Sequence, residues 1–294
     1  MKKEILIGVD FGGTKILTGA MTGKGEVLCE PVKVPTGGSD EGNKIIKRLT
    51  DSIDELLARA KLNLNEVRGI GMGVTGPLDI KNGKILECPQ LPTLHFFPLR
   101  KTVEDHFRVP VYMNNDANCL IFGEAIFGSG VGMDNVLGFT LGTGLGCAII
   151  LDRKIFVGST ESSGEIWPSP FRDGTIEDYV CGAGVSRMFK EKSGEEKSAL
   201  DIAILAEKGD ADALATWEKF GEYLSFAISW SVNIIDPQVV ILGGSISNAY
   251  KFFSGSMEKN LRKHICPVPA KETRVVCAQL GSNAGFIGAA ALTL

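Results

Sequence analysis

The fold is decided by the stretch ILIGVDFGGTKILTGAMT, residues 5–22, because its pattern occurs a second time in the chain. An apolar, β-branched run ends in Asp10, a Gly-Gly turn follows, and an alternating run leaves the turn, as expected for a strand hairpin. The same pattern recurs in NVLGFTLGTGLGCAIILDRKIF, residues 135–156. A recurrence in register predicts a duplicated α/β domain with a cleft between two similar halves. The matched positions are Gly8 and Gly138, Asp10 and Thr140, Gly12 and Gly142, and Thr14 and Gly144.

Helical and strand patterns alternate in both halves of the chain. Residues 39–60 carry apolar side chains at helical spacing, and residues 213–236 form a long, mostly apolar helical pattern. Strands that alternate with helices predict α/β layers built on mixed sheets. We further expect strands at 68–75 and 237–247, a strand through Met113 followed by a helix from about Asp116, and a closely packed helix at 282–294.

Composition favours an ordinary globular protein that binds small polar ligands. The 294 residues are 44% hydrophobic and 22% charged, and this length favours two domains. A net charge of -4 does not suggest binding to nucleic acid or to an anionic membrane, which would favour an excess of basic residues. No apolar run approaches the ~20 residues needed to span a bilayer, and the first residues turn acidic too soon for a secretory signal. We therefore expect a cytoplasmic protein.

Cysteine and histidine usage gives no support for metal binding. The seven cysteines are scattered, and none forms a C-x-x-C pair, so we expect small buried hydrophobic residues kept reduced. The three histidines are far apart in the sequence, which offers no support for a histidine metal site or base. These residues are Cys29, Cys88, Cys119, Cys147, Cys181, Cys266 and Cys277, with His95, His106 and His264.

Both glycine hairpins are candidate phosphate sites. Backbone N–H groups beside glycine can approach phosphate oxygens closely, and in the first hairpin the Thr14 hydroxyl and Lys15 ammonium are additional donors. Either hairpin alone is more often a simple turn without a ligand. Two such hairpins in register are much stronger evidence for phosphate binding. Neither hairpin has the spacing of a P-loop or a Rossmann fingerprint.

Two aspartates have alternative interpretations from local sequence. Asp10 ends a strand just before the first hairpin, where it could hold magnesium through water or simply cap a turn. Asp116 lies where a strand gives way to a helix, so it is either an N-cap or a general base. In the second case Asn115 would bind an adjacent hydroxyl group.

Taken together, the motifs resemble those of the ROK (repressor, open reading frame, kinase) family of sugar kinases, in the actin-like ATPase superfamily. The resemblance covers nearly the whole chain and implies an α/β fold of two duplicated ribonuclease-H-like domains with an interdomain cleft that binds ATP, magnesium and a hexose. We expect domains at 1–117, completed by the C-terminal helix 283–294, and at 118–282. The motifs are IGVDFGGTK, GVTGP, NNDANCLIFGEAIFG, LGFTLGTGLGCAII, SSGEI and VVILGGSIS, in the family's order and approximate spacing.

The resemblance also implies roles for individual residues. Asp116 would be the catalytic base and a sugar contact, and Asp10 would hold magnesium, through water. The other implied sugar contacts are Gly76, Asn115, Glu165 and Glu177. The implied nucleotide contacts are Asp10, Gly12, Gly13, Thr14, Lys15, Thr143 and Gly144 at the phosphates, with Gly243 and Gly244 bordering adenosine.

The chain departs from the family pattern after Glu165. The family continues this glutamate as G-E-I-G-H and then a zinc loop, but here Trp167 and Pro168 occupy the glycine and histidine positions. The segment from Pro168 to Gly174 is too short for the cysteine loop, so we expect no zinc. Trp167 would then stack on the sugar or pack the shortened loop, and packing is the expectation because buried aromatic residues are usually structural. The remaining acidic residues nearby, Glu161, Asp173 and Asp178, are expected to be solvated charges.

We therefore predict ATP- and magnesium-dependent phosphorylation of a hexose or aminosugar, as in glucokinases or N-acetylhexosamine kinases. The alternative is a catalytically silent sugar- or nucleotide-binding sensor of the same fold, and a kinase for a non-hexose acceptor also stays open. The chain begins at its first strand, which leaves no room for the DNA-binding helices of repressor members. We expect a sugar partner and neither nucleic acid nor membrane. The resemblance also suggests a homodimer.

Overall fold

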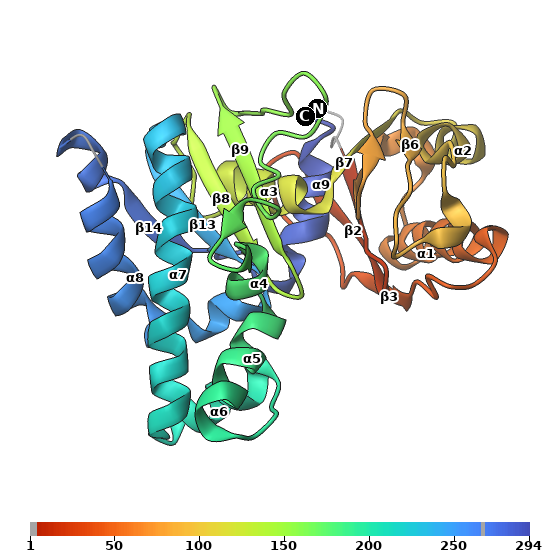
Figure 1. The fold of residues 1–294 in the computed structure, drawn as a ribbon. Helices are drawn as coiled ribbons and strands as arrows, with labels where there is room; N and C mark the ends of the chain where they lie inside the picture. Colours follow the sequence, from red (N-terminus) through yellow and green to blue (C-terminus); the bar gives the residue numbers. More distant parts are fainter. Residues whose placement is uncertain (1–4, 266–267) are drawn as a thin grey trace. The chain divides into compact units, whose positions relative to one another are not determined.

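The computed structural model describes residues 5–265 and 268–294, which form two compact units. The first unit contains Met1–Val131, Gly158–Glu161 and Gln279–Leu294, and the second contains Gly132–Val157 and Ser162–Ala278. The domain limits expected from the sequence, 1–117 with 283–294 and 118–282, stay a prediction. Figure 1 shows the chain coloured from its N-terminus to its C-terminus.

The first unit is built on a five-stranded sheet with the order β3-β2-β1-β4-β7. Its central strand β1 (Ile5–Phe11) pairs antiparallel with β2 (Lys15–Thr22), which pairs antiparallel with β3 (Val32–Pro35). On the other side β4 (Val67–Val74) and β7 (Val111–Asn115) run parallel to β1. The carboxyl ends of β1, β4 and β7 therefore meet at one edge.

Side-chain alternation along β1 divides the core of this unit between the two faces of the sheet. Ile5, Ile7 and Val9 belong to a cluster with the apolar residues of helix α1 (Gly42–Ala60), as the helical spacing of 39–60 predicted. Leu6 belongs to a separate cluster with helix α9 (Ala284–Ala291). The period of two in the strand is thus matched by a helix on each face.

Two glycines let α9 pack directly against the sheet. A Cβ on Gly8 would lie 1.8 Å from the carbonyl oxygen of Phe286, and a Cβ on Gly71 would lie 1.7 Å from that of Ala289. Real atoms cannot approach so closely, so the helix could not occupy this position over larger residues. The other elements of the unit are α2 (Leu99–Phe107), α3 (Asp116–Phe127), β5 (Leu78–Asp79), β6 (Lys84–Ile85), and the 3₁₀ turns Leu64–Glu66, Pro92–Leu94 and Gly281–Asn283.

The second unit repeats the sheet pattern in the order β10-β9-β8-β13-β14. Its central strand β8 (Val136–Leu141) pairs antiparallel with β9 (Leu145–Leu151), and β9 pairs with β10 (Lys154–Ile155). Strand β13 (Val239–Gly243) runs parallel to β8, and β14 (Arg274–Cys277) runs parallel to β13. Each unit therefore has an antiparallel hairpin on one side of its central strand and two parallel strands on the other, which confirms the predicted duplicated α/β fold.

Helices α7 (Ala211–Ile235) and α8 (Tyr250–His264) lie side by side in the second unit (Figure 1). Trp217 and Phe220 of α7 meet Phe253 of α8 in a buried aromatic cluster, with the Phe220 and Phe253 rings 5.1 Å apart. Over residues 5–265 and 268–294, no helix has both the length and the apolar content to cross a membrane. The remaining elements are α4 (Glu177–Val180), α5 (Gly182–Ser193), α6 (Ala199–Glu207), β11 (Pro170–Phe171), β12 (Gly174–Thr175), and the 3₁₀ turns Ser245–Ala249 and Val268–Glu272.

The cysteines agree with the sequence prediction of reduced, mostly buried thiols. None of those in the described part of the chain forms a disulfide. Cys88, Cys119, Cys147 and Cys181 are buried, whereas Cys29 and Cys277 are partly buried, and Cys266 lies outside the described residues.

Candidate functional site

The carboxyl edge of the first sheet brings the two candidate aspartates together. Asp10 lies opposite Gly73 of β4, and Gly73 lies opposite Asn114 of β7. Because neighbouring strands are about 4.8 Å apart, the backbones at Asp10 and Asn114 are about 10 Å apart. Asp116 follows two residues later, at the first position of α3. Residues distant in sequence therefore share one edge.

Asp10 is a largely buried carboxylate with one basic partner. Its side chain is 17% exposed, and its Oδ2 lies 3.3 Å from the Lys15 Nζ. Burial raises the pKa of the Asp10 carboxyl, and the charge and hydrogen bond of Lys15 offset part of this rise. A Cβ on Gly285, in the first turn of α9, would lie 2.8 Å from the Asp10 Cγ, so only glycine leaves room for the carboxylate there.

A single carboxylate suits magnesium better than a metal that needs a protein cage. Magnesium keeps several waters and is usually held by one or two carboxylates together with substrate phosphates. Within residues 5–265 and 268–294, no group of three or more His, Cys, Asp or Glu side chains could hold a metal ion. Asp10 supplies the single carboxylate that a magnesium ion held through water would use, and this assignment stays a prediction.

The first glycine hairpin is held by the segment that follows β3. The Gly12 N–H donates to the Lys15 carbonyl oxygen at 3.0 Å, which closes the turn. The Thr36 hydroxyl donates to the Gly12 carbonyl at 2.6 Å, and the Thr36 N–H donates to the Thr14 carbonyl at 3.0 Å. These contacts occupy carbonyl oxygens of the turn and fix its backbone. The turn is therefore suited to present the N–H groups of Gly13 and Thr14 to an anion.

Gln90 contacts this hairpin and was not found from the sequence. A Cβ on Gly13 would lie 2.5 Å from the Gln90 Cβ, and the Gln90 Oε1 lies 3.3 Å from the thiol of Cys88. Gly13 and Gln90 are far apart in the chain, and the sequence around Gln90 has no regular hydrophobic period. Local sequence carries no signal for such a contact.

The cap of α3 is formed by Asn115. The Asn115 Oδ1 accepts a hydrogen bond from the Ala117 N–H at 2.9 Å, and Asn115 is the N-cap. Asp116 is instead the first helical residue, and its Oδ1 also accepts from Ala117, at 2.8 Å. The interpretation of Asp116 as the N-cap is therefore wrong, because the helix begins one residue earlier than that interpretation requires.

Asp10 and Asp116 lie near one buried thiol, that of Cys119. Burial raises the pKa of Cys119 well above its ordinary value, and the charges of Asp116 and then Asp10 raise it further. A Cβ on Gly73, which lies opposite Asp10, would lie 3.0 Å from the Cys119 Cβ and 3.5 Å from the Asp116 Cα, so the three residues share this edge. Gly76 is also at this edge, since a Cβ there would lie 3.2 Å from the Asn115 Nδ2. The predicted residues of the first unit are thus gathered at one place.

The second hairpin, between β8 and β9, contains Thr143 and Gly144. The Gly142 N–H donates to the Gly144 carbonyl at 3.1 Å. Gly243, at the end of β13, pairs with Thr140 of β8. Gly243 and Gly244 therefore lie beside the strand that leads into this hairpin. Gly244 needs glycine, because its φ is 85° and a Cβ would lie 2.3 Å from the Leu141 carbonyl oxygen.

Glu177 contacts the same hairpin. Its Oε2 accepts a hydrogen bond from the Leu145 N–H at 2.8 Å, and a Cβ on Gly144 would lie 2.6 Å from that oxygen. The predicted sugar contact of Glu177 stays a prediction. The observed contact is to the backbone of the candidate phosphate hairpin, across 32 residues of sequence.

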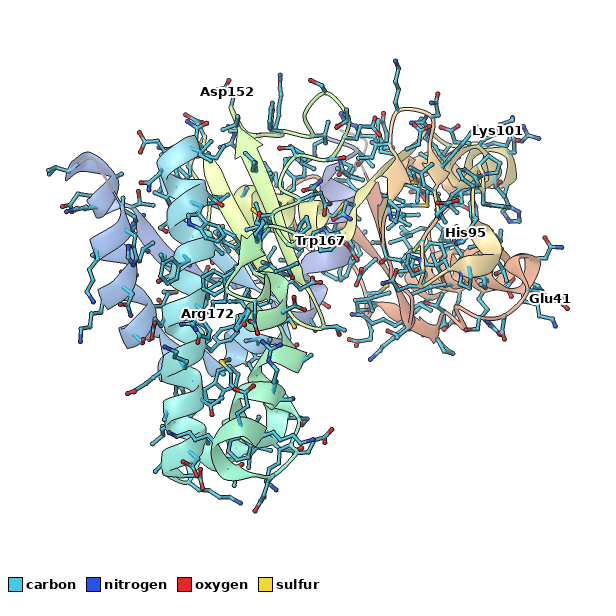
Figure 2. All side chains as sticks on the ribbon, viewed as in Figure 1. Glu41, His95, Lys101, Asp152, Trp167 and Arg172 are labelled. Carbon is cyan, nitrogen blue, oxygen red and sulfur yellow. The ribbon has the colours of Figure 1, made fainter. Side chains whose placement is uncertain are left out.

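Glu165 is paired with Trp167 in the loop that departs from the family pattern. The indole Nε1 donates to the Glu165 Oε2 at 2.6 Å. Trp167, labelled in Figure 2, is 43% exposed and so only partly buried, and its packing in the shortened loop stays a prediction. Burial raises the pKa of Cys147 in β9 to about 12, and the negative charge of Glu165 contributes to this rise.

A short hairpin, β11 and β12, occupies the place expected for a zinc loop. Its Phe171 packs among aromatic rings, with centroid distances of 5.3 Å to Tyr179, 5.5 Å to Tyr223 and 5.4 Å to Phe226. Arg172, labelled in Figure 2, lies with its guanidinium 4.8 Å from the Tyr223 ring centroid. An aromatic core therefore supports this loop.

Of the three acidic residues expected to be solvated, Asp173 and Asp178 are exposed and Glu161 is partly buried, and all three also accept hydrogen bonds. Glu161 accepts from the backbone N–H groups of Ile80 and Lys81. Asp173 accepts from the Tyr179 hydroxyl, and Asp178 accepts from the N–H and hydroxyl of Thr175. Each carboxylate fixes a turn, which composition alone could not indicate.

Comparison with known proteins gives a consistent result. The model of the ROK family matches residues 6–294. The N-acetyl-D-glucosamine kinase of Aliivibrio salmonicida is 31% identical over 307 residues, covering 98% of this chain and 99% of the relative. The glucokinase of Halalkalibacterium halodurans is 29% identical, covering 98% and 94%. The crystal structure of a ROK family glucokinase from Streptomyces griseus in complex with glucose and AMPPNP is 27% identical and covers 98% of each chain, with a TM-score of 0.81.

Proposed function

Because the chain belongs to the ROK family, we propose that it is a sugar kinase that transfers the γ-phosphoryl group of ATP to a hexose or aminosugar hydroxyl. The observation that carries this proposal is the pair of carboxylates, Asp10 and Asp116, at one edge of the first sheet. The names of the similar proteins, a glucokinase and an N-acetyl-D-glucosamine kinase, support the same class of acceptor.

Asp116 is the proposed general base. A loose phosphoryl-transfer transition state requires the base only to orient the hydroxyl and to take its proton late, so one carboxylate suffices. Asp116 keeps its backbone fixed at the first position of α3, while the cap is formed by Asn115. Asn115 and Gly76, which lie together, are the proposed neighbours of the sugar in this unit. Glu165 and Glu177 are the proposed sugar contacts of the second unit.

The glycine hairpins are the proposed phosphate contacts. Gly13 and Thr14 are the proposed backbone N–H donors, Gly12 closes the turn through its own N–H and leaves room for close approach, and the Lys15 ammonium adds a positive charge. The corresponding contacts of the second unit are Thr143 and Gly144 for phosphate, with Gly243 and Gly244 for adenosine. Magnesium, held by Asp10 through water, would neutralise charge on the phosphate oxygens.

The cytoplasm is the proposed place of action. ATP is the proposed donor, and cysteines without disulfides, as in the described part of the chain, are typical of a reducing compartment.

Release of ADP tests the proposal. The protein is incubated with magnesium and ATP and with a panel of hexoses, N-acetylhexosamines and ketohexoses, and we expect at least one sugar to stimulate release. Replacement of the base, Asp116→Asn, is expected to lower kcat on the order of 10²-fold or more with little loss of sugar binding. The control Asp51→Asn changes an exposed aspartate that pairs with Lys47, and should leave kcat unchanged.

Two outcomes would contradict the proposal. Sugar binding without stimulated ADP release would support the alternative of a silent sensor. Unchanged turnover in Asp116→Asn would refute the assignment of the base while leaving the kinase activity in place.

A further inference from the structure

Trp167 is unlike the other two tryptophans of the chain. Trp217 is buried, at 1% exposure, and Trp230 packs against Phe171 in an aromatic cluster. Trp167 is 43% exposed, and its Nε1 donates a hydrogen bond to the Glu165 carboxylate at 2.6 Å. The indole N–H is a donor only, so this bond uses the whole hydrogen-bonding capacity of the side chain. The faces of the ring are left for an apolar contact.

The backbone of Trp167 is hydrogen-bonded to Glu177, the second proposed sugar-binding glutamate of this unit. Its carbonyl oxygen accepts a hydrogen bond from the Glu177 N–H at 3.4 Å. Glu177 in turn accepts from the Leu145 N–H beside Gly144. A continuous series of hydrogen bonds therefore runs within the second unit from Glu165 through Trp167 and Glu177 to the hairpin after β8.

The loop around Trp167 is braced on both sides. The Ile166 N–H donates to the Gly164 carbonyl at 2.7 Å, and the Ile166 side chain packs against the core of the unit. Gly164 has a φ of 86°, and a Cβ there would lie 2.3 Å from the Cys147 carbonyl oxygen, so only glycine lets the loop lie against β9. Pro168 restricts the backbone immediately after Trp167. The indole is therefore presented from a firm support.

Resting on the proposed function, we infer that Trp167 positions Glu165 and selects the acceptor sugar. The indole N–H holds the Glu165 carboxylate so that it accepts a sugar hydroxyl in one orientation, because a charge-assisted bond is strong and directional. The exposed face of the indole contacts the apolar face of the sugar ring. A pyranose with equatorial hydroxyls carries axial C–H bonds that form such a face. The preferred acceptor class is therefore a gluco-configured pyranose, such as glucose or N-acetylglucosamine, rather than a sugar with an axial hydroxyl or a furanose.

Steady-state kinetics of Trp167→Phe test the positioning role. Phenylalanine keeps an apolar ring and removes the N–H, so we expect KM for a gluco-configured sugar to rise on the order of 10-fold while KM for ATP stays unchanged. Trp167→Ala, which also removes the ring, should raise it further and reduce the preference for glucose over mannose. Because Trp167 is exposed, the melting temperature should stay within about 2 °C of the wild type, which separates the effect from misfolding.

A double-mutant cycle isolates the bond to Glu165. If Trp167 acts through this carboxylate, Trp167→Phe should have little additional effect on KM in a Glu165→Gln background. Fully additive effects would overturn the positioning role.

Fluorescence gives a reading that does not depend on turnover. Sugar without ATP should change tryptophan emission in the wild type and in the control Trp230→Phe, and the change should be lost in Trp167→Phe. Normal phosphorylation with an unchanged KM in Trp167→Phe would overturn this inference alone. Absence of phosphorylation of every sugar by the wild type would overturn the proposed function and this inference with it.

Discussion

Replacement of Glu124 is expected to destabilise the first unit strongly. Glu124 lies in α3 with no exposed surface, and its carboxylate accepts three backbone hydrogen bonds. The Oε1 accepts from the N–H groups of Gln279 and Leu280 at 2.9 and 2.7 Å, and the Oε2 accepts from that of Ser129 at 2.9 Å. The carboxylate thus ties α3 to the segment that leads into α9.

The expected magnitude follows from these three bonds. In Glu124→Ala three N–H groups lose a charged acceptor in a buried place, and breaking such a buried arrangement costs about 3–5 kcal/mol of the free energy of unfolding. For a unit of this size the melting temperature should fall by about 10 °C. Glu124→Gln keeps one acceptor oxygen but turns an NH₂ group toward a donor, so about half of this loss is expected.

Urea denaturation followed by circular dichroism measures the effect. The matched control is Glu55→Ala in α1, where an exposed glutamate pairs with Arg59, and a change within about 0.5 kcal/mol is expected. A loss below about 1 kcal/mol in Glu124→Ala would refute the reasoning, since it would mean that water or other groups satisfy the three donors equally well.

Three further perturbations have definite expected outcomes. Gly71→Ala places a Cβ 1.7 Å from the Ala289 carbonyl oxygen and should lower the free energy of unfolding by about 1–3 kcal/mol or more, as measured by thermal unfolding. In the control Gly255→Ala the new Cβ meets no atom within 4 Å, so this change should be neutral or slightly stabilising. Burial raises the pKa of Asp10 despite Lys15, so the folded state binds its proton more tightly than the unfolded state, and the ionised form reduces stability above that pKa. Asp10→Asn should therefore raise the melting temperature at pH 7, and the gain should disappear below about pH 4, where Asp10 is protonated in both states; a gain that does not depend on pH would contradict this. A zinc-selective chelator, with magnesium kept in excess, should leave ADP release and melting temperature unchanged, and a loss of either would contradict the prediction of no zinc.

Strand and helix positions could be predicted because they depend on local periodicity. The alternation in residues 5–22 and its repeat after Val136 indicated two hairpins, and parallel strands beside each complete the same sheet. Asp10 and Asp116 could be chosen as site residues because Asp10 is the penultimate residue of β1 and Asp116 directly follows β7, at the edge that the parallel arrangement brings together. The identity of the α3 cap could not be chosen, since adjacent Asn and Asp residues have nearly equal capping preference.

The sequence determined the duplicated α/β fold, the two glycine hairpins and the edge that carries Asp10 and Asp116, because these follow from spacings of a few residues and from the direction of parallel strands. Only the tertiary structure decided how the acidic side chains are used. The bond of Trp167 to Glu165, the contact of Glu177 with the second hairpin and the three bonds of Glu124 depend on side-chain direction and on packing between distant segments. A periodic pattern predicts which face a residue occupies, but a carboxylate accepts from whichever donors the folded backbone brings within reach.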